Sequence, residues 1–279
     1  MYDSLATNGK IIVGDCVSAM RALDPETARL VIADPPYFQV QLKEAWDTAW
    51  PDEDAYLQWT HVWMDAAMQV LAPGGLLYCF GQPGKREQAM LHLMSQAARA
   101  WQFHDLIVWD RVVGADERRD SFTPAYELIL VLRKPGQVAF DKSAVREPYD
   151  EATIVRYMKD KRYKNPNARR EHLSRGKYAT NIWRIPSLKG ARSEKVGHPT
   201  QKPAALIERI VSSSSAPGDL VIDPFLGSGT TALVAEKLQR SWIGIEIDEG
   251  YAGIALERLR KFKQNRAGTV SGQGKLIEN

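Results

Sequence analysis

The sequence predicts an α/β fold in which helices cover both faces of one mostly parallel β-sheet. Short runs of strand-forming apolar residues alternate with segments of helical periodicity along most of the 279 residues. Two polar motifs directly follow such runs, at positions where a strand is expected to end. A basic segment in the middle of the chain interrupts the alternation. These observations indicate one large domain that carries an insertion.

Strands are expected where short apolar runs are rich in Val, Ile, Leu and aromatic residues. These runs lie at residues 11–13, 30–33, 76–80, 106–109, 128–132, 220–222 and 242–247. Apolar residues recur at helical spacing between Tyr56 and Val70, which predicts a helix over 55–71 that stops at Pro73-Gly74-Gly75. Further helices are expected at 204–211 and 230–238.

Four segments are expected along the chain. They are residues 1–140 as one half of the domain, 141–196 as the inserted recognition region, 197–263 as the other half and 264–279 as a flexible polar tail. The irregular stretches 38–54 and 113–123 are expected to be loops beside the functional edge of the sheet. From its position alone, we expect 38–54 to close over the ligands.

The inserted region is strongly basic. Residues 140–195 contain 15 Lys and Arg against 7 Asp and Glu, a balance of +8, whereas the remainder of the chain carries −5. Tyrosine and tryptophan side chains between Tyr149 and Trp183 are interleaved with the basic residues. This pattern is typical of a surface that contacts a polyanion, and a solvated loop with incidental charge is the alternative.

The composition is that of an ordinary globular protein, with 44% hydrophobic and 25% charged residues. No apolar stretch reaches the roughly 18 residues of a membrane span, and the N-terminus lacks the layout of a signal peptide. Cys16 and Cys79 form neither a disulfide framework nor a metal-binding spacing, so no metal is expected. A reduced, cytoplasmic setting is therefore expected.

A glycine motif, from Asp223 to Thr231, follows the expected strand 220–222. Glycines at 227 and 229 would let the backbone approach a ligand closely where the strand turns into a helix, and Thr230 or Thr231 could cap that helix. No lysine follows the glycines, which disfavours a phosphate-binding Walker loop, and Ala232 replaces the third glycine of a dinucleotide fingerprint. A tight structural turn is the alternative.

Two features support a ligand at this turn. Glu246 ends the next strand, where an acid can accept hydrogen bonds from both ribose hydroxyls of a nucleoside. The segment His198 to Pro203 precedes the helix 204–211, with Thr200 as a candidate cap and Pro203 as a first-turn residue. This segment is either an ordinary helix start or a set of polar side chains that bind the carboxylate of an amino-acid-like cofactor.

The second motif, Asp34-Pro35-Pro36-Tyr37, follows the expected strand 30–33. The exocyclic amines of adenine and cytosine are poor nucleophiles, because their lone pairs delocalise into the ring. An amine whose two hydrogens are both accepted can pyramidalise toward an incoming methyl group; Asp34 and the Pro35 carbonyl supply two such acceptors. The two prolines stiffen the turn, and Tyr37 can stack on a base extracted from a duplex. A strand-ending turn without chemistry is the alternative.

The order of these motifs resembles that of the β-class amino-group DNA methyltransferases, which carry the DPPY motif. Their DPPY block comes first, a target-recognition region lies in the middle and the cofactor block comes last, as it does here between about Ile11 and Phe262. The resemblance implies a circularly permuted, Rossmann-like methyltransferase fold and S-adenosylmethionine as the cofactor. Aspartate at position 34 favours adenine N6, because serine is more usual in cytosine-N4 enzymes.

The resemblance also implies the site residues. Asp34, Pro35, Pro36 and Tyr37 would be catalytic. The cofactor would be bound by Asp15, Cys16, Asp34, His198, Thr200, Gln201, Lys202, Asp223, Phe225, Gly227, Ser228, Gly229, Thr230, Glu246 and Ile247. Within this set, Phe225 and the glycines would line the methionine half, Glu246 would bind the ribose and Asp15 would face the adenine. Thr200, Gln201 and Lys202 would anchor the methionine end.

Double-stranded DNA is the partner that the resemblance implies, and the basic insertion would bind it. The candidate contacts are Lys159, Lys161, Arg162, Lys164, Arg169, Arg170, Arg175 and Lys177. A homodimer and a cognate restriction endonuclease are further partners of such enzymes, and the sequence leaves both open. The leading hypothesis is a site-specific DNA adenine-N6 methyltransferase that extracts its base. The rivals are a cytosine-N4 methyltransferase, a protein or RNA methyltransferase and a non-catalytic DNA-binding subunit.

Overall fold

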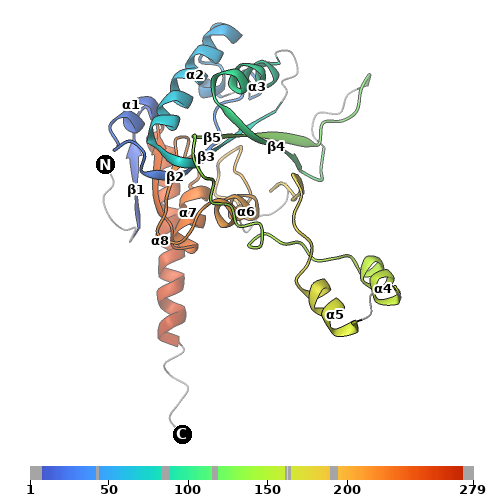
Figure 1. Ribbon diagram of the computed structural model, residues 1–279. Coiled ribbons are helices and arrows are strands. Elements are labelled where there is room, and N and C mark those ends of the chain that lie inside the picture. Colours follow the sequence, from blue (N-terminus) through green and yellow to red (C-terminus); the bar gives the residue numbers. More distant parts are fainter. Residues whose placement is uncertain are drawn as a thin grey trace.

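The computed structural model describes residues 8–41, 44–82, 88–114, 119–160, 162, 165–188 and 194–272, with side chains up to residue 265. Within these residues, one sheet of eight strands runs through the molecule in the order β1-β8-β7-β2-β3-β5-β4-β6 (Figure 1). The strands are β1 Gly9–Val13, β2 Ala28–Ala33, β3 Leu71–Gly81, β4 Gln102–Asp110, β5 Tyr126–Arg133, β6 Ile182–Arg184, β7 Leu220–Asp223 and β8 Ser241–Glu246.

All neighbouring strands are parallel except where β5 meets β3 and β4. The expectation of a mostly parallel α/β sheet is therefore confirmed. All seven expected strands are present. The short β6 was not expected, because Ile182 to Arg184 has too few apolar residues to stand out from the basic region around it.

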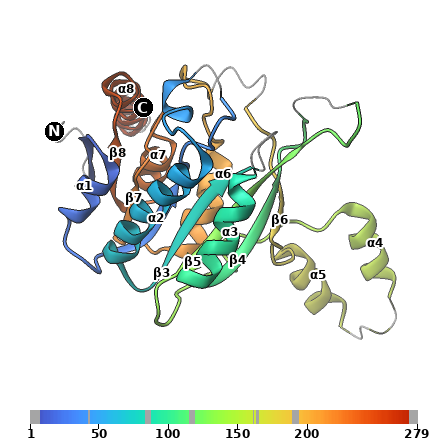
Figure 2. The same ribbon diagram turned by 90° about the horizontal axis from the view of Figure 1, so that it is seen from above.

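Helices cover both faces of the sheet, as Figure 2 shows from above. The helices of the sheet are α1 Cys16–Arg21, α2 Glu53–Val70, α3 Ala89–Ala100, α6 Ala204–Ser214, α7 Thr230–Lys237 and α8 Glu249–Gly272. The first three pack on one face, where Val31 and Ala33 of β2 point. The second three pack on the other face, where Leu30 and Ile32 point into a core shared with α6 and α7. Both faces of β2 are thus buried, as expected of a central parallel strand.

The expected helix 55–71 is confirmed as α2. Asp52 is its N-cap, and the Asp52 side chain accepts a hydrogen bond from the Ala55 amide at 2.8 Å. The expected stop at Pro73-Gly74-Gly75 is wrong in one respect. The helix already ends at Val70, because Leu71 pairs with Ala28 and opens strand β3.

The chain beyond residue 263 departs from the expectation of a flexible tail. Helix α8 continues to Gly272 and extends away from the sheet at the lower end of Figure 1. Its sequence from Gln264 is polar, so no apolar periodicity marked it as helical. No helix in the described part of the chain is long and apolar enough to cross a lipid bilayer.

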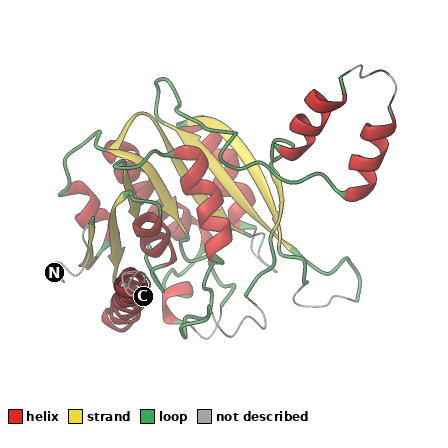
Figure 3. Ribbon diagram, turned by 90° about the horizontal axis from the view of Figure 1, so that it is seen from below, coloured by secondary structure: helices red, strands yellow, loops and turns green. Residues whose placement is uncertain are grey.

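The inserted region forms a helical hairpin that projects from the sheet (Figure 3). Its helices are α4 Glu151–Lys159 and α5 Pro166–Ser174. They are joined at their base by the Tyr149 hydroxyl and the His172 ring, 3.1 Å apart. The end of the predicted insertion returns to the body, because β6 pairs with β4 and extends the sheet at its edge.

Candidate active site

The two motifs meet at the carboxyl edge of the sheet. Asp34 directly follows β2 and Asp223 ends β7, and these strands are parallel neighbours in which Val31 lies opposite Ile222. The connection after β2 is α2 on one face, whereas the connection after β7 is α7 on the other. Strand order therefore reverses between β2 and β7. In open α/β sheets, ligands bind at such a topological switch point.

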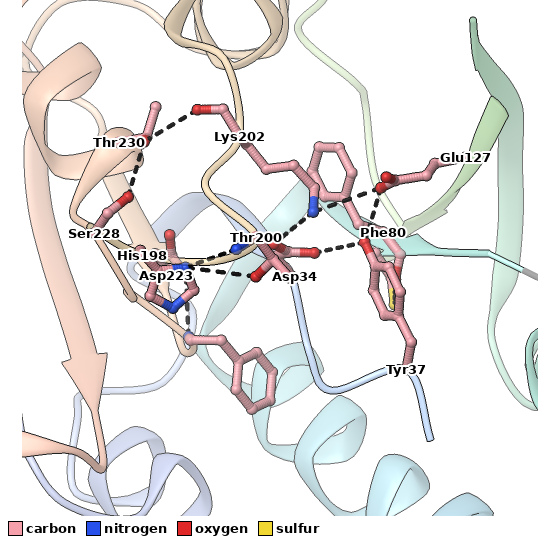
Figure 4. Close-up of polar contacts among 12 residues, drawn as sticks. Asp34, Tyr37, Phe80, Glu127, His198, Thr200, Lys202, Asp223, Ser228 and Thr230 are labelled. Carbon is pink, nitrogen blue, oxygen red and sulfur yellow. Dashed lines mark hydrogen bonds and ion pairs between the residues drawn. The ribbon is translucent and has the colours of Figure 1, made fainter. Parts of the chain in front are cut away.

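Asp34 belongs to a compact polar cluster (Figure 4). Its Oδ1 accepts a hydrogen bond from the Tyr37 hydroxyl at 2.6 Å, and its Oδ2 accepts one from Lys202 Nζ at 2.7 Å. Glu127 on β5 also lies within reach of these two donors: its Oε2 is 3.0 Å from the hydroxyl and 3.5 Å from the ammonium. Arg111 completes the cluster, with Nη1 at 3.3 Å from Glu127 Oε1.

The cluster balances two carboxylates against two cations. Burial alone would lower the pKa of Lys202, but Asp34 and Glu127 outweigh it and hold that pKa above its ordinary value. Burial and the same two carboxylates raise the pKa of Tyr37 well above its ordinary value, so this side chain is a neutral phenol. The Asp34 side chain is 22% exposed, against 8% for Lys202 and 9% for Glu127. Asp34 is thus the member that an incoming ligand can reach.

Asp47, which the sequence analysis did not single out, holds the turn that follows the Asp34 motif. Its buried carboxylate accepts hydrogen bonds from the backbone amides of Tyr37, Val40 and Gln41, at 2.6, 2.7 and 2.5 Å. Burial raises its pKa in spite of these bonds. No sequence signal marked it, because its partners lie six to ten positions earlier on an irregular segment.

Phe38 fixes the same segment from the apolar side. It is 2% exposed and stacks on Tyr56 of α2 with ring centroids 5.3 Å apart. The Tyr56 hydroxyl also donates to the Pro36 carbonyl at 2.8 Å. The start of the predicted loop 38–54 is therefore anchored to the body, and its closing over ligands stays a prediction.

The glycine motif forms the tight turn that its sequence indicates. Gly227 and Gly229 have φ of +50° and +77°, in the left-handed region that favours glycine. A side chain at Gly229 would lie 2.8 Å from the Cβ of Ala255 on α8. The turn is bound to the next strand, since Glu246 Oε2 accepts a hydrogen bond from the Gly227 amide at 2.7 Å.

Neither threonine caps α7, so that expectation is wrong. The N-cap is Gly229, without a side-chain hydrogen bond. The Thr230 hydroxyl instead donates to the Lys202 carbonyl at 3.2 Å and accepts from Arg258 at 2.9 Å. Ser228 lies 3.4 Å from the same hydroxyl. Thr230 thus ties the glycine turn to the segment that carries Lys202.

Three carboxylates line this edge, on Asp34, Asp223 and Glu246. Burial, with a smaller contribution from the other two carboxylates, raises the pKa of Asp223 to about 7. Burial also raises the pKa of Glu246. Such a group of acids favours a ligand that brings positive charge and disfavours phosphates.

The segment from His198 to Lys202 is built differently from the expectation. The His198 ring packs edge-on against the Tyr251 ring, with ring centroids 4.4 Å apart. Burial, and secondarily Lys202, lowers its pKa to about 4, so it is neutral. Thr200 does not cap α6; its amide binds His198 Nδ1 at 3.3 Å, and Glu194 accepts from the first amide of α6, that of Ala204, at 2.7 Å.

Gln201 closes the same loop, with its amide group bound to the backbone of Val196 and Glu194 at 3.0 and 2.8 Å. One lone pair of the oxygen and one hydrogen of the amide nitrogen remain, so the role of Gln201 as a cofactor anchor stays a prediction. Lys202 directs its ammonium to Asp34 and Glu127, and its role as an anchor of the methionine end stays a prediction.

The remaining predicted cofactor residues are Asp15, Cys16, Phe225 and Ile247. Asp15 caps α1, where it accepts from the Ser18 amide at 2.8 Å. Cys16 is buried, and burial raises the pKa of its thiol to about 12. Ile247, directly after β8, is 69% exposed, an apolar surface open to a ligand. Phe225 packs against Trp59 and Trp63 of α2.

The predicted DNA contacts fall into four groups, of which Arg169 is the last. Lys159, Arg170, Arg175 and Lys177 are exposed on the projecting hairpin. Arg162 is exposed but paired with Asp160 at 2.7 Å. Lys161 and Lys164 lie outside the described residues.

Arg169 is the exception, and its prediction as a phosphate contact is wrong. It is 8% exposed, and Nη1 donates to the Tyr157 and Met158 carbonyls at the end of α4, at 3.0 and 2.7 Å. The Met158 carbonyl lies in the last turn of α4, where a helix leaves carbonyls without intrahelical partners, and the Tyr157 carbonyl also accepts from the Asp160 amide at 3.3 Å. The sequence does not show which of Arg169 and Arg170 is buried, because that depends on which face of α5 packs against α4 in the folded hairpin.

Comparisons with known proteins identify the family of this chain. The model of the DNA methylase family for N6 and N4 enzymes matches residues 28–257. The chain is 31% identical to the type II methyltransferase M1.MboII of Moraxella bovis, over 92% of this chain and 98% of that protein. It is 30% identical to the DNA adenine methyltransferase YhdJ of Escherichia coli K12, over 96% and 92% of the two chains.

Among solved structures, the fold is similar to that of the cytosine-N4-specific PvuII DNA methyltransferase. The TM-score is 0.68 at 20% sequence identity, over 93% of this chain and 91% of that chain. The match of the family model spans the Asp34 motif, the basic insertion and the glycine turn. This chain therefore belongs to the N6 and N4 DNA methylase family.

Proposed function

We propose that this protein transfers a methyl group from S-adenosylmethionine to the N6 amine of adenine at a specific site in double-stranded DNA. The observation that carries the proposal is the Asp34 carboxylate, which lies at the switch point of the sheet as the reachable member of a charge-balanced cluster. Membership of the methylase family supports methyl transfer to DNA. The aspartate at position 34 and the name of the relative YhdJ support adenine.

The chain itself supplies the acceptors for the target amine. Asp34 is the more exposed carboxylate of the cluster, and it can accept one amino hydrogen when an oxygen turns from Tyr37 or Lys202 toward the amine. The Tyr56 hydroxyl holds the Pro36 carbonyl and fixes the turn, which leaves the Pro35 carbonyl as the second acceptor. Accepting both hydrogens localises the nitrogen lone pair and orients it for in-line attack.

The residues fit S-adenosylmethionine. This cofactor supplies an electrophilic methyl group on a positively charged sulfonium. The carboxylates of Asp34, Asp223 and Glu246 favour such a cation, whereas they would repel the phosphates of a dinucleotide. The turn at Gly227 and Gly229 would lie beside the methionine part. Asp15 and the exposed Ile247 would hold the adenosine part, together with Glu246.

Glu246 can keep its present partners when a ribose binds. Its two oxygens accept from the amides of Gly227 and Asp248 at 2.7 and 3.0 Å. Each oxygen keeps one further lone pair for a ribose hydroxyl, so the amides can stay bound. The acid then serves both to hold the turn and to receive the sugar.

The projecting hairpin is the proposed DNA surface. Its exposed basic residues, Lys159, Arg170, Arg175 and Lys177, can contact phosphates and position the duplex. The target base must leave the stack to reach Asp34, and Tyr37 would receive it. A homodimer and a cognate endonuclease would be partners of the same system in the cytoplasm.

Cytosine-N4 methylation is the second candidate, favoured by the fold similarity to the PvuII enzyme. Both amines need the same pair of acceptors, so the chemistry of Asp34 fits either base. The test is to methylate DNA with the purified protein, digest it to nucleosides and identify the product by mass spectrometry. N6-methyladenine is expected. Finding only N4-methylcytosine would show that the second candidate function is correct. Unmodified DNA would favour a non-catalytic subunit. Transfer of a labelled methyl group to RNA or protein, and not to DNA, would indicate a different substrate.

A further inference from the structure

Both internal donors to Asp34 share one second acceptor. The Tyr37 hydroxyl is 2.6 Å from Asp34 and 3.0 Å from Glu127 Oε2. The Lys202 ammonium is 2.7 Å from Asp34 and 3.5 Å from that same Oε2 atom. Asp34 and Glu127 come from β2 and β5, which are separated in the sheet by β3. Glu127 was in none of the sequence-predicted sets.

We propose that Glu127 is a positioning residue for methyl transfer, which accepts the Tyr37 hydroxyl and the Lys202 ammonium when the target amine binds Asp34. A phenol has one proton to donate, so the Tyr37 hydroxyl can serve one carboxylate fully or two partially. If Asp34 turns an oxygen toward the amine, its former donors need another acceptor, because unpaired buried polar groups are costly. Glu127 already lies within reach of both.

Glu127 is fixed well enough for this role. It is 7% exposed and sits inside β5, where it lies opposite Trp109 of β4. Arg111 holds its other oxygen at 3.3 Å and is itself held by the Pro124 carbonyl at 3.3 Å. Asp34, by contrast, lies on the turn after β2 and is more exposed. The acceptor that stays in place is thus in the sheet, and the acceptor that changes partners is at its edge.

The charge of Glu127 is as important as its position. The carboxylate draws part of the Lys202 ammonium away from Asp34. Without that charge, Asp34 would be the remaining anionic partner of Lys202 within the cluster, and the amine would compete with a full ion pair. Loss of the charge is therefore expected to slow methyl transfer more than it weakens the binding of cofactor or DNA.

The test is Glu127→Gln, which keeps the size of the side chain and removes its charge. This experiment rests on the proposed amine methylation, so the full-length wild type is first shown to methylate duplex DNA. In single-turnover reactions, the rate constant is expected to fall by on the order of 10- to 100-fold, the effect of losing a hydrogen bond to a charged group. The dissociation constants for S-adenosylmethionine and DNA are expected to stay within about twofold.

Two further variants separate positioning from general stability. Glu236→Gln removes another buried carboxylate, which binds Trp242 Nε1 at 3.0 Å on the far side of the sheet core, and is expected to keep the wild-type rate. Glu127→Asp retains the charge with a shorter reach and is expected to recover part of the lost rate. If the Glu127→Gln protein does not fold, the Glu127→Asp comparison decides: a rate above background supports the charge role, and a rate at background overturns it.

A double-mutant cycle gives the sharpest readout. In a Tyr37→Phe background one of the two donors is gone, so Glu127→Gln is expected to reduce the rate less than in the wild type. If Glu127→Gln reduces the rate by the same factor in both backgrounds, the proposal is overturned. A Glu127→Gln rate within twofold of the wild type would also overturn it. A wild type that methylates no DNA amine refutes the proposed function instead.

Discussion

The buried carboxyl of Asp223 makes the stability of the cofactor-free protein depend on pH. Burial, aided by Asp34 and Glu246, raises its pKa from an ordinary value of 3.8 to about 7. A raised pKa means that the folded state binds the proton more tightly than the unfolded state. Its contribution to stability is thus fully present below about pH 4 and is lost as pH rises through about 7.

The magnitude follows from the two pKa values. At about 1.4 kcal/mol for each pH unit, the interval from 3.8 to about 7 corresponds to a change on the order of 4 kcal/mol in the free energy of unfolding. Asp223→Asn removes the ionisation but keeps an oxygen that can accept from the Phe225 amide, which lies 2.9 Å from the carboxylate. Relative to wild type, this variant is expected to gain stability as pH rises from 5 to about 7, and the difference is expected to level off at higher pH.

The assay is denaturant unfolding of both proteins at intervals from pH 5 to 8 without cofactor, plotted as the difference in the free energy of unfolding. Taking the difference cancels other titrating groups, such as His198. Asp120→Asn, an exposed change in the loop after β4, is the control and is expected to give a flat difference. A flat difference for Asp223→Asn as well would refute the argument that burial raises this pKa.

Three further outcomes are expected. Asp34→Ala should reduce methyl transfer by on the order of 1,000-fold while the affinity for S-adenosylmethionine, measured by calorimetry, changes little; an active variant would remove the mechanism. Asp47→Ala should unfold about 2 to 4 kcal/mol more easily and lower the turnover number, because three amides lose their acceptor; unchanged melting would contradict this. Arg170→Ala should reduce the slope of DNA affinity against salt by about 1, whereas Arg169→Ala should lower the melting temperature and leave the slope unchanged; equal slopes for wild type and Arg170→Ala would place the DNA surface elsewhere.

The fold was largely predictable because its signals are local. Each of the seven expected strands is a short apolar run, and burial on both faces of a parallel sheet demands such runs. The missed elements lack that signal. Strand β6 has three residues, and the end of α8 is polar.

The candidate site was predictable where its residues follow strands. Parallel strands bring their carboxyl ends to one edge, so Asp34 and Glu246 could be placed together before any contact was known. Capping roles were less predictable, because Thr200 and Thr230 each have other partners within reach in the folded chain. Arg169 and Arg170 are adjacent and chemically identical, and only packing makes one buried.

The sequence by itself determined the order of the motifs, the strand ends on which they lie and the chemistry that an aspartate between an apolar run and two prolines can perform. Only the tertiary structure decided what surrounds that aspartate. Glu127 is 90 positions from Tyr37, and Lys202 is 168 positions from Asp34. No local pattern relates residues so far apart. Their charges come to balance one another because the sheet sets β5 beside β3 and the loop before α6 over its edge.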